Sequence, residues 1–177
     1  MRPHHHPVLA SLGRGSGVAG AVAALAGVLA VVALALPWHE ATAELAMLGV
    51  AEDRAVATIP GWSTVAGWVA AVSGAVAVGL GVALAIDRHP GWTRPCLLAA
   101  TAALVVSGLV AQLRRPTLER FPDGAGAVAE LRAVAGDLPR GVELTLAVRP
   151  GPAAVAALVA GLTLLVAVAA ARDLDQR

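Results

Sequence analysis

The chain has no lysine, asparagine or tyrosine, and its single cysteine, Cys96, excludes an internal disulfide. Nucleic acid is not expected as a partner, because a net charge of +1 leaves no concentrated basic face for phosphates. All 13 basic residues are arginine, a bias that GC-rich codons produce. We therefore expect the protein to come from a high-GC bacterium, with actinobacteria favoured.

Charge is also absent from four long apolar stretches, at residues 15–36, 63–86, 95–113 and 153–171. Each reaches the length of about 20 residues that a helix needs to cross a hydrocarbon core of about 30 Å. The apolar fraction of 58% and the mean hydropathy of +0.74 also exceed those of ordinary soluble domains. The sequence predicts an all-α membrane protein. Its fold would be a four-transmembrane-helix bundle forming one domain, residues 15–171, between cytoplasmic tails at 1–14 and 172–177.

The first stretch has an alternative interpretation as a secretory signal. Arg2 and Arg14 precede it, and residues 33–35 resemble a cleavage site. Its apolar run is longer than the usual core of about 7–15 residues in a signal peptide. We therefore expect it to be retained as a transmembrane helix.

The orientation of the spans depends on arginine, because the chain has no other strongly basic residue. An even number of spans places the two long loops, 37–62 and 114–152, on the same side of the membrane. The arginines divide almost evenly between the two sides, but Arg2 and Arg14 directly precede the first span, where the positive-inside rule gives charges most weight. We expect a multi-pass plasma-membrane protein with both termini in the cytoplasm.

The two long loops carry the pattern of β-strands. Larger apolar residues occupy every second position of residues 142–148, and residues 40–47 alternate more weakly. Because an isolated hairpin is marginal in water, we expect these segments to pair, with residues 55–59 returning after a turn at 49–53. A short helix is expected over residues 123–134. Together these elements predict a small extracytoplasmic β-containing cap. The alternative is that both loops are disordered linkers.

Small residues recur at every fourth position of the second span, at Gly67, Ala71, Ala75 and Gly79. Helices in lipid associate through close van der Waals packing, which a stripe of small residues permits. We expect this stripe to face a neighbouring helix, to make the second span central, and to allow the closest approach of backbones at its two glycines, Gly67 and Gly79. Alanine is so frequent in this chain that the alternative is a chance stripe facing lipid.

The four tryptophans lie near the predicted ends of the spans. Trp38 follows the first span, Trp62 and Trp68 stand at the start of the second, and Trp92 precedes the third. Amphipathic indole rings are favoured at the boundary between membrane and water. We expect these residues to be interface anchors rather than parts of a ligand site.

The sequence offers little that resembles catalytic chemistry. Uncharged spans disfavour a coupled transporter or a proton channel, since those proteins need ionisable groups within the bilayer. The nearest approach to a reactive cluster is an outer polar cluster of His39, Glu40 and Glu44, in which His39 could bind a metal or titrate. Adjacent strand residues point to opposite faces, so a solvated edge is the expected role. No catalytic residue, metal site or cofactor is predicted.

Short motifs at three span ends carry a family resemblance: Leu36-Pro37-Trp38, Gly61-Trp62-Ser63 and Gly91-Trp92. With these motifs the chain resembles the small four-span actinobacterial membrane proteins associated with tryptophan-biosynthesis operons. That resemblance implies a four-span topology and no particular activity. The layout of two outer loops forming a small sheet over four helices also resembles the claudins, in architecture only, because the first outer loop has no cysteine.

Two functions remain open at this point. The first is a non-enzymatic integral membrane protein acting as a structural, accessory or interaction subunit through its outer cap and helix surfaces. Its partners would be membrane lipid and another membrane protein or a second copy of itself. The alternative is a small-molecule or lipid-binding membrane protein with an apolar cavity between the bundle and the cap.

Overall fold

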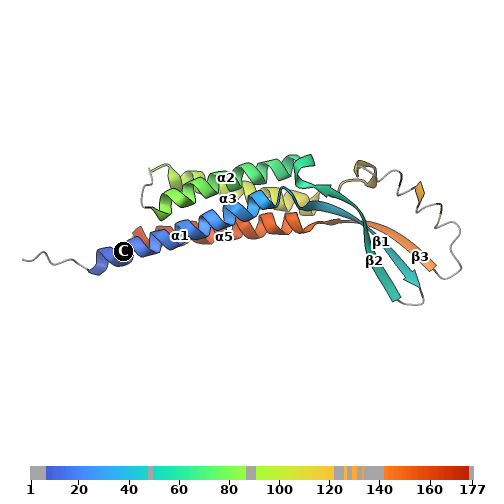
Figure 1. The fold of residues 1–177 in the computed structure, drawn as a ribbon, viewed down its shortest axis with the longest axis horizontal. Helices are drawn as coiled ribbons and strands as arrows, with labels where there is room; N and C mark the ends of the chain where they lie inside the picture. Colours follow the sequence, from blue (N-terminus) through green and yellow to red (C-terminus); the bar gives the residue numbers. More distant parts are fainter. Residues whose placement is uncertain are drawn as a thin grey trace, which may run out of the picture.

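Helices make up most of the chain, and a small sheet stands at one end of them. The computed structural model describes residues 7–47, 50–86, 91–121, 126, 129–130, 133 and 142–175. The elements, in order, are α1 (Pro7–Val32), β1 (Pro37–Met47), β2 (Val50–Pro60), η1 (Gly61–Ser63), α2 (Val65–Ala85), α3 (Thr93–Leu113), η2 (Leu118–Arg120), β3 (Val142–Pro150) and α5 (Pro152–Asp175). Figure 1 shows the helices side by side along the long axis, with the sheet projecting beyond one end.

The four long helices, α1, α2, α3 and α5, are together called the helical body. In it α1 packs against α2 and α5, and α3 packs against the same two helices, so each helix has two principal neighbours. The most extensive of these contacts is between α1 and α2. The second predicted span, α2, is therefore no more central than the others.

Three helices are long and apolar enough to cross a membrane, at Val65–Ala85, Thr93–Leu113 and Pro152–Ala171. They coincide closely with the last three predicted spans, and they are the helices of a multi-pass membrane protein. The apolar part of α1, Gly17–Val32, is shorter.

The first helix ends at Val32 rather than at the predicted Leu36. After Val32 the backbone tightens, because the N–H groups of Leu34 and Ala35 donate to carbonyls three residues back, at 3.1 and 3.0 Å. Pro37 then follows without an N–H to continue the helix. The apolar run that continues through residues 33–36 is thus a turn rather than helix.

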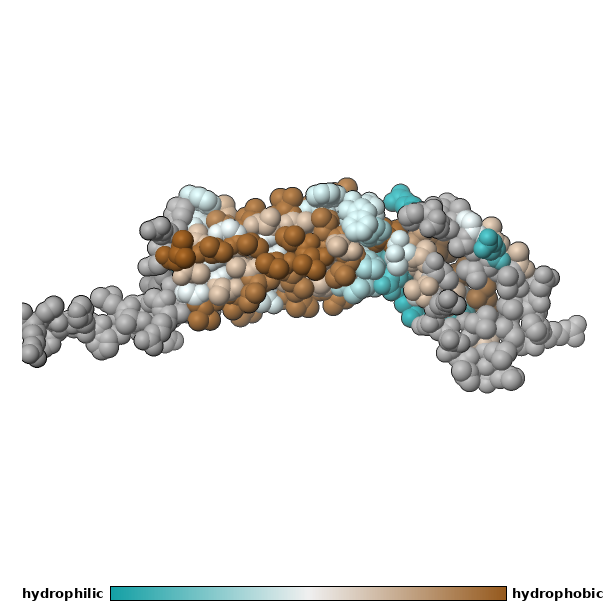
Figure 2. Space-filling view, in the orientation of Figure 1, coloured by the Kyte–Doolittle hydropathy of each residue, from teal (hydrophilic) through white to brown (hydrophobic). Residues whose placement is uncertain are grey.

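Small side chains fill the inside of the helical body, and larger apolar side chains cover its outside. Ala30 and Ala77 are fully buried, whereas Leu25 and Val72 are more than half exposed. Figure 2 shows hydrophobic residues over much of the helical body and hydrophilic residues gathered where it meets the sheet. Such a surface suits lipid, in which small residues let backbones approach and large apolar residues face the acyl chains.

Two pairs of glycines bring α1 and α2 into backbone contact. A Cβ on Gly81 would lie 2.6 Å from the backbone nitrogen of Ala24, and a Cβ on Gly20 would lie 2.5 Å from the carbonyl oxygen of Gly81. A Cβ on Gly74 would lie 2.7 Å from the carbonyl oxygen of Gly27. The close approach between α1 and α2 therefore occurs at these glycines and not at the stripe predicted on α2.

The predicted stripe of small residues on α2 splits between two faces. Gly67 and Ala71 are buried, but Ala75 and Gly79 are exposed, and no atom lies within 4 Å of a Cβ built on Gly79. Four residues of an α-helix turn by about 400°, so a four-residue spacing drifts by about 40° at each step. Three such steps turn Gly79 by about 120° away from the face of Gly67. Close approach at Gly79 is therefore not what the structure shows.

The sheet has the strand order β2-β1-β3, and both pairs are antiparallel. The predicted pairing of residues 142–148 with residues 40–47 is confirmed, since β1 and β3 align from Glu40 opposite Arg149 to Met47 opposite Val142. The second strand starts earlier than predicted. Its residues pair with β1 from Val50 onward, so the expected turn at 49–53 is mostly strand. Residues 48 and 49 lie outside the described part of the chain.

Most of the short helix predicted over residues 123–134 lies outside the described residues. Gly126, Ala129, Glu130 and Ala133 are described, and all four are helical. These four positions agree with the predicted helix.

One face of the sheet is covered by the chain that follows α3. Ala41 from β1, Ile59 from β2 and Phe121 form a small buried cluster, and Leu118 of η2 packs against it. This contact holds the segment between α3 and η2 against the base of the sheet, where the strands meet the helical body.

The strand register predicts a selective disulfide. In a Cys96→Ala background, cysteines at Glu44 and Thr145 should crosslink under mild oxidation, because these residues are direct partners in the register. The Cα atoms of antiparallel partners lie about 4.5–5.5 Å apart, within disulfide range. Cysteines at Glu44 and Leu146 form the control, since adjacent strand residues point to opposite faces. Mobility on a non-reducing gel measures both, and equal crosslinking of the two pairs would contradict the register.

Candidate functional site

Trp38 lies inside the protein rather than at its surface. Its side chain has no exposed area, and its Nε1–H donates to the carbonyl oxygen of Ala33 at 2.9 Å. The indole thereby adds a donor to a carbonyl just after α1, which also accepts a longer hydrogen bond from the Leu36 N–H at 3.3 Å. A Cβ on Gly61 would lie 2.5 Å from Nε1, so η1 also packs closely on the ring. Trp38 is a buried residue of the junction, not the exposed anchor that its position beside a span suggested.

The other three tryptophans are exposed, as interface anchors would be. Trp62 and Trp68 are 56% and 54% exposed at the sheet end of α2, where Trp68 Nε1–H donates to the Trp62 carbonyl at 2.9 Å. Trp92 is 58% exposed and precedes α3 at the opposite end of the helical body. The rings therefore mark two levels separated by the length of α2. Their role as a membrane belt stays a prediction.

The structure separates the residues of the outer polar cluster. Glu44 forms an ion pair with Arg149 on β3, at 3.8 Å, and both side chains are substantially exposed. Such a surface pair contributes little to stability. Glu40 is half-buried beside it on β1, whereas His39 is only 8% exposed. The histidine belongs to a different site.

That site is a pocket at the junction of the helical body and the sheet, here called the junction pocket. Its volume is about 770 Å³, and it is lined by His39, Ile59, residues 63–65, residues 113–117 and Arg120. These residues come from the start of β1, from the stretch that runs from the end of β2 through η1 to the start of α2, and from the stretch that runs from the end of α3 to η2. Three separate stretches of the chain thus meet where strands become helices.

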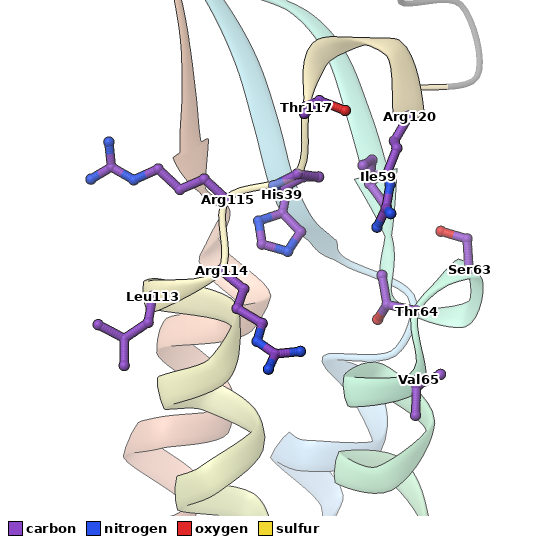
Figure 3. A pocket seen from close by; sticks show the side chains of 11 residues that line it. His39, Ile59, Ser63, Thr64, Val65, Leu113, Arg114, Arg115, Thr117 and Arg120 are labelled. Carbon is purple, nitrogen blue, oxygen red and sulfur yellow. The ribbon is translucent and has the colours of Figure 1, made fainter.

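The polar side of the junction pocket is basic. Three arginines line it, Arg114, Arg115 and Arg120, and none of the described residues that line it is an aspartate or a glutamate. Figure 3 shows Arg114 and Arg120 directed toward the space beside His39, whereas the guanidinium of Arg115 points away from it. All three side chains are exposed and therefore open to a ligand. The pocket therefore favours an anion.

His39 brings an unsatisfied polar atom to the same space. Its Nδ1 is buried and has no hydrogen-bond partner among the described residues. A buried polar group without a partner costs about 1–3 kcal/mol. Desolvation by burial also lowers the pKa of His39 from its usual value of 6.5. A ligand that hydrogen-bonded to Nδ1 would remove the cost of leaving this atom without a partner.

The pocket also has an apolar side, at the ends of two helices. Val65 opens α2 and is 82% exposed, and Leu113 closes α3 and is 80% exposed. Both residues line the junction pocket. A ligand here meets arginines on one side and apolar side chains continuous with the helix surface on the other. This arrangement suits a molecule with an anionic end and an apolar end.

The lowered pKa of His39 predicts how stability depends on pH. In the unfolded chain the imidazole takes up a proton as the pH falls through 6.5, whereas the buried ring of the folded protein resists it. The unfolded state then binds more protons, so the free energy of unfolding should fall as the pH drops below 6.5. Melting temperatures of ligand-free protein in detergent at pH 7.5 and 5.5 measure this loss. It should shrink in His39→Gln, and an unchanged loss would show that His39 is not responsible.

In the sequence the three pocket arginines are recognisable only as loop charges. The available signal is local: a pair, Arg114 and Arg115, directly after the third span, and Arg120 a few residues later. Nothing in the sequence places His39 in the same pocket, because that arrangement depends on how the chain after α3 packs against the sheet. Within the described residues, no three His, Cys, Asp or Glu side chains gather as a metal site requires.

The junction pocket therefore has the geometry of a binding site with a basic side and an apolar side. It lies between the helical body and the sheet, where one of the two expected functions required a cavity. Comparison of the chain with protein-family models, curated proteins and solved structures finds no match to any of the three.

Proposed function

We propose that this protein is a non-enzymatic, four-span membrane protein that binds a membrane amphiphile in its junction pocket. The fourth span of this proposal is α1, which packs along both α2 and α5 and exposes large apolar side chains, including Leu25, outward. A helix with such neighbours and such an outer surface belongs in the same environment as the three longer ones.

The tryptophans support a position for the membrane. At 1.5 Å per residue, the 21 residues of α2 span about 30 Å, the thickness of a hydrocarbon core. Trp62 and Trp68 stand at one end of that length and Trp92 at the other. In this placement the sheet lies outside the bilayer and the junction pocket lies at the level of the lipid headgroups. Both described chain ends lie at the opposite end from the sheet (Figure 1), the side proposed as cytoplasmic.

A labelling experiment tests this topology. In a Cys96→Ala background, a membrane-impermeant maleimide added to intact cells should modify a cysteine at Thr145, on the projecting sheet, and spare one at Trp92. Both positions are exposed, so protection would report the membrane rather than burial. The reverse pattern would show the opposite orientation. Labelling at both positions would show that one of the four helices does not cross the membrane.

The observation that carries the binding function is the composition of the junction pocket. It combines three arginines and a buried, unpartnered His39 Nδ1 with the exposed apolar side chains of Val65 and Leu113. An interaction surface alone does not require such a pocket. The site differs from the cavity expected from the sequence, because its lining is basic on one side rather than apolar throughout.

Filling the pocket tests the function. Thr117 lines the junction pocket and is exposed, so Thr117→Trp should occupy the space without disturbing the core. Thr145→Trp, at an exposed position on β3, is the matched control. Protein purified in mild detergent should retain a lipid detectable by native mass spectrometry in the wild type and in Thr145→Trp, and lose it in Thr117→Trp. Equal retention by all three proteins would place the lipid elsewhere.

The projecting sheet favours a second candidate function, that of an interaction subunit. In the part of the chain that the structure describes, β2 and β3 form the two edges of the sheet, and neither pairs with a further strand. Exposed strand edges can pair with a partner chain. A photoreactive residue at Thr145 should then crosslink to one protein at high yield, whereas the same residue at Trp92 should not. Crosslinking to lipid or to no protein at Thr145 would count against this function.

A further inference from the structure

We propose that the junction pocket recognises a phosphate-bearing, net-anionic lipid headgroup, with Arg114 and Arg120 as its charged contacts and His39 as a hydrogen-bonding contact. This inference rests on the proposed function, since it names the class of amphiphile that the pocket holds.

The charge of the lining points to an anion with several acceptor oxygens. Arg114 and Arg120 approach the same space from two segments, the end of α3 and η2. Among the described residues neither has an ion-pair partner, and no carboxylate lines the pocket to neutralise them. The planar guanidinium presents paired donors that match the oxygens of a phosphate. Two such groups can hold separate oxygens of one phosphate.

The start of α2 adds to this positive potential. Thr64 caps the helix by accepting a hydrogen bond from the Gly67 N–H at 2.9 Å, and Thr64 and Val65 both line the junction pocket. The N-terminus of a 21-residue helix carries the positive end of its dipole and favours a nearby anion. The dipole and the arginines therefore both attract an anion into the pocket.

His39 supplies an observation independent of charge. The residue is 8% exposed, its ring faces the space into which Arg114 and Arg120 point (Figure 3), and its Nδ1 has no partner among the described residues. As an N–H donor, Nδ1 would contribute a hydrogen bond to a phosphate oxygen. A bound anion also favours the protonated ring, so binding would strengthen as the pH falls toward the pKa of His39. Among the described residues that line the pocket, the arginines are the other titratable groups beside His39.

The apolar side distinguishes a lipid from a free phosphate ion. Val65 and Leu113 are more than three-quarters exposed, and they line the pocket at its boundary with the helical body. An acyl chain leaving the headgroup along these residues would meet an apolar surface that continues over the helices (Figure 2). Inorganic phosphate would leave that side of the pocket unused.

The test compares lipids in binding to the purified full-length protein in detergent, followed by native mass spectrometry. The probes are phosphatidylglycerol, which has a net negative charge, zwitterionic phosphatidylcholine, and inorganic phosphate as a competitor. We expect the wild type to prefer phosphatidylglycerol by about tenfold or more, because the phosphates of both lipids can bind the arginines but the choline cation of phosphatidylcholine is repelled by them. An excess of inorganic phosphate should not displace the lipid.

The double variant Arg114→Gln/Arg120→Gln should lose most of this preference while keeping its melting temperature, because both side chains are exposed. His39→Phe, which keeps a ring and removes its polar atoms, should weaken phosphatidylglycerol binding by a smaller factor. Arg149→Gln is the matched control, because Arg149 lies on β3 outside the pocket lining. It should bind phosphatidylglycerol as the wild type does.

Each contrary outcome has a distinct meaning. If the wild type binds both lipids equally, or if the double variant keeps the preference, headgroup recognition by these arginines is overturned and the proposed function survives. If inorganic phosphate displaces the lipid at comparable concentration, the ligand is a free anion and the lipid assignment is overturned. If no lipid binds at all, the proposed function itself fails.

Discussion

Replacing Gly81 by leucine is expected to lower the free energy of unfolding by about 3 kcal/mol, the upper range for overpacking a rigid interface. A Cβ at this position would lie 2.6 Å from the backbone nitrogen of Ala24 and 2.7 Å from the carbonyl oxygen of Gly20. Backbone atoms of a neighbouring helix cannot rotate aside as a side chain can. The new side chain must therefore push α1 and α2 apart along their most extensive contact.

Gly79→Leu is the matched control for this prediction. It makes the same chemical change on the same helix, two residues away, but a Cβ on Gly79 would meet no atom within 4 Å. Both variants gain helix propensity over glycine, by about 1 kcal/mol, so the difference between them reports packing alone. Thermal unfolding in detergent, followed by circular dichroism, measures both. A Gly79→Leu protein less stable than Gly81→Leu would reverse the assignment of faces.

The contrast between these glycines shows what hydrophobic patterning can and cannot predict. The lengths and limits of α2 and α3 followed from uninterrupted apolar runs, because the thickness of a bilayer fixes the length of a span. Which face of α2 packs inward did not follow. In a chain so rich in alanine, several small-residue stripes are available on every helix, and the neighbouring helix selects one of them.

The sheet was more predictable than the helix faces because its signal is specific. Alternation at residues 142–148 has a period that a helix cannot satisfy, and the need to pair an isolated strand leaves few partners. The early start of β2 at Val50 was not predicted, because residues 50–53 pair with β1 where the sequence suggested a turn.

The junction pocket lay beyond sequence reasoning for a different physical reason. Its lining residues come from segments as far apart in the chain as His39 and Arg120, and the packing of Phe121 and Leu118 on the sheet helps to bring these segments together. Composition revealed arginines outside the spans but not their convergence. The pocket lies between helices and sheet, and its basic side was not foreseen.

Trp38 is the residue on which the junction between the helical body and the sheet most depends. Its indole donates to the Ala33 carbonyl at the end of α1, and its own carbonyl accepts from the Gly151 N–H, just before α5, at 2.9 Å. Gly61 packs against the ring on a third side. One buried side chain and its backbone therefore tie the ends of α1 and β2 and the start of α5 to the first strand.

Trp38→Ala is accordingly expected to cost about 3–5 kcal/mol, the range for removing a large buried aromatic side chain. Trp38→Phe separates the two contributions, because it keeps most of the apolar volume and removes only the indole N–H. It should cost about 1 kcal/mol, since the Ala33 carbonyl still accepts from the Leu36 N–H at 3.3 Å. Trp92→Ala, at a residue that is 58% exposed, is the control and should change stability least.

Thermal unfolding in detergent ranks these variants, and lipid retention provides a second measurement. Because Trp38 holds together segments that line the junction pocket, Trp38→Ala should also release the bound lipid at temperatures at which Trp92→Ala retains it. If Trp38→Ala unfolds no earlier than Trp92→Ala, the junction is held by other contacts, and the burial of Trp38 would be a consequence of the fold rather than one of its causes.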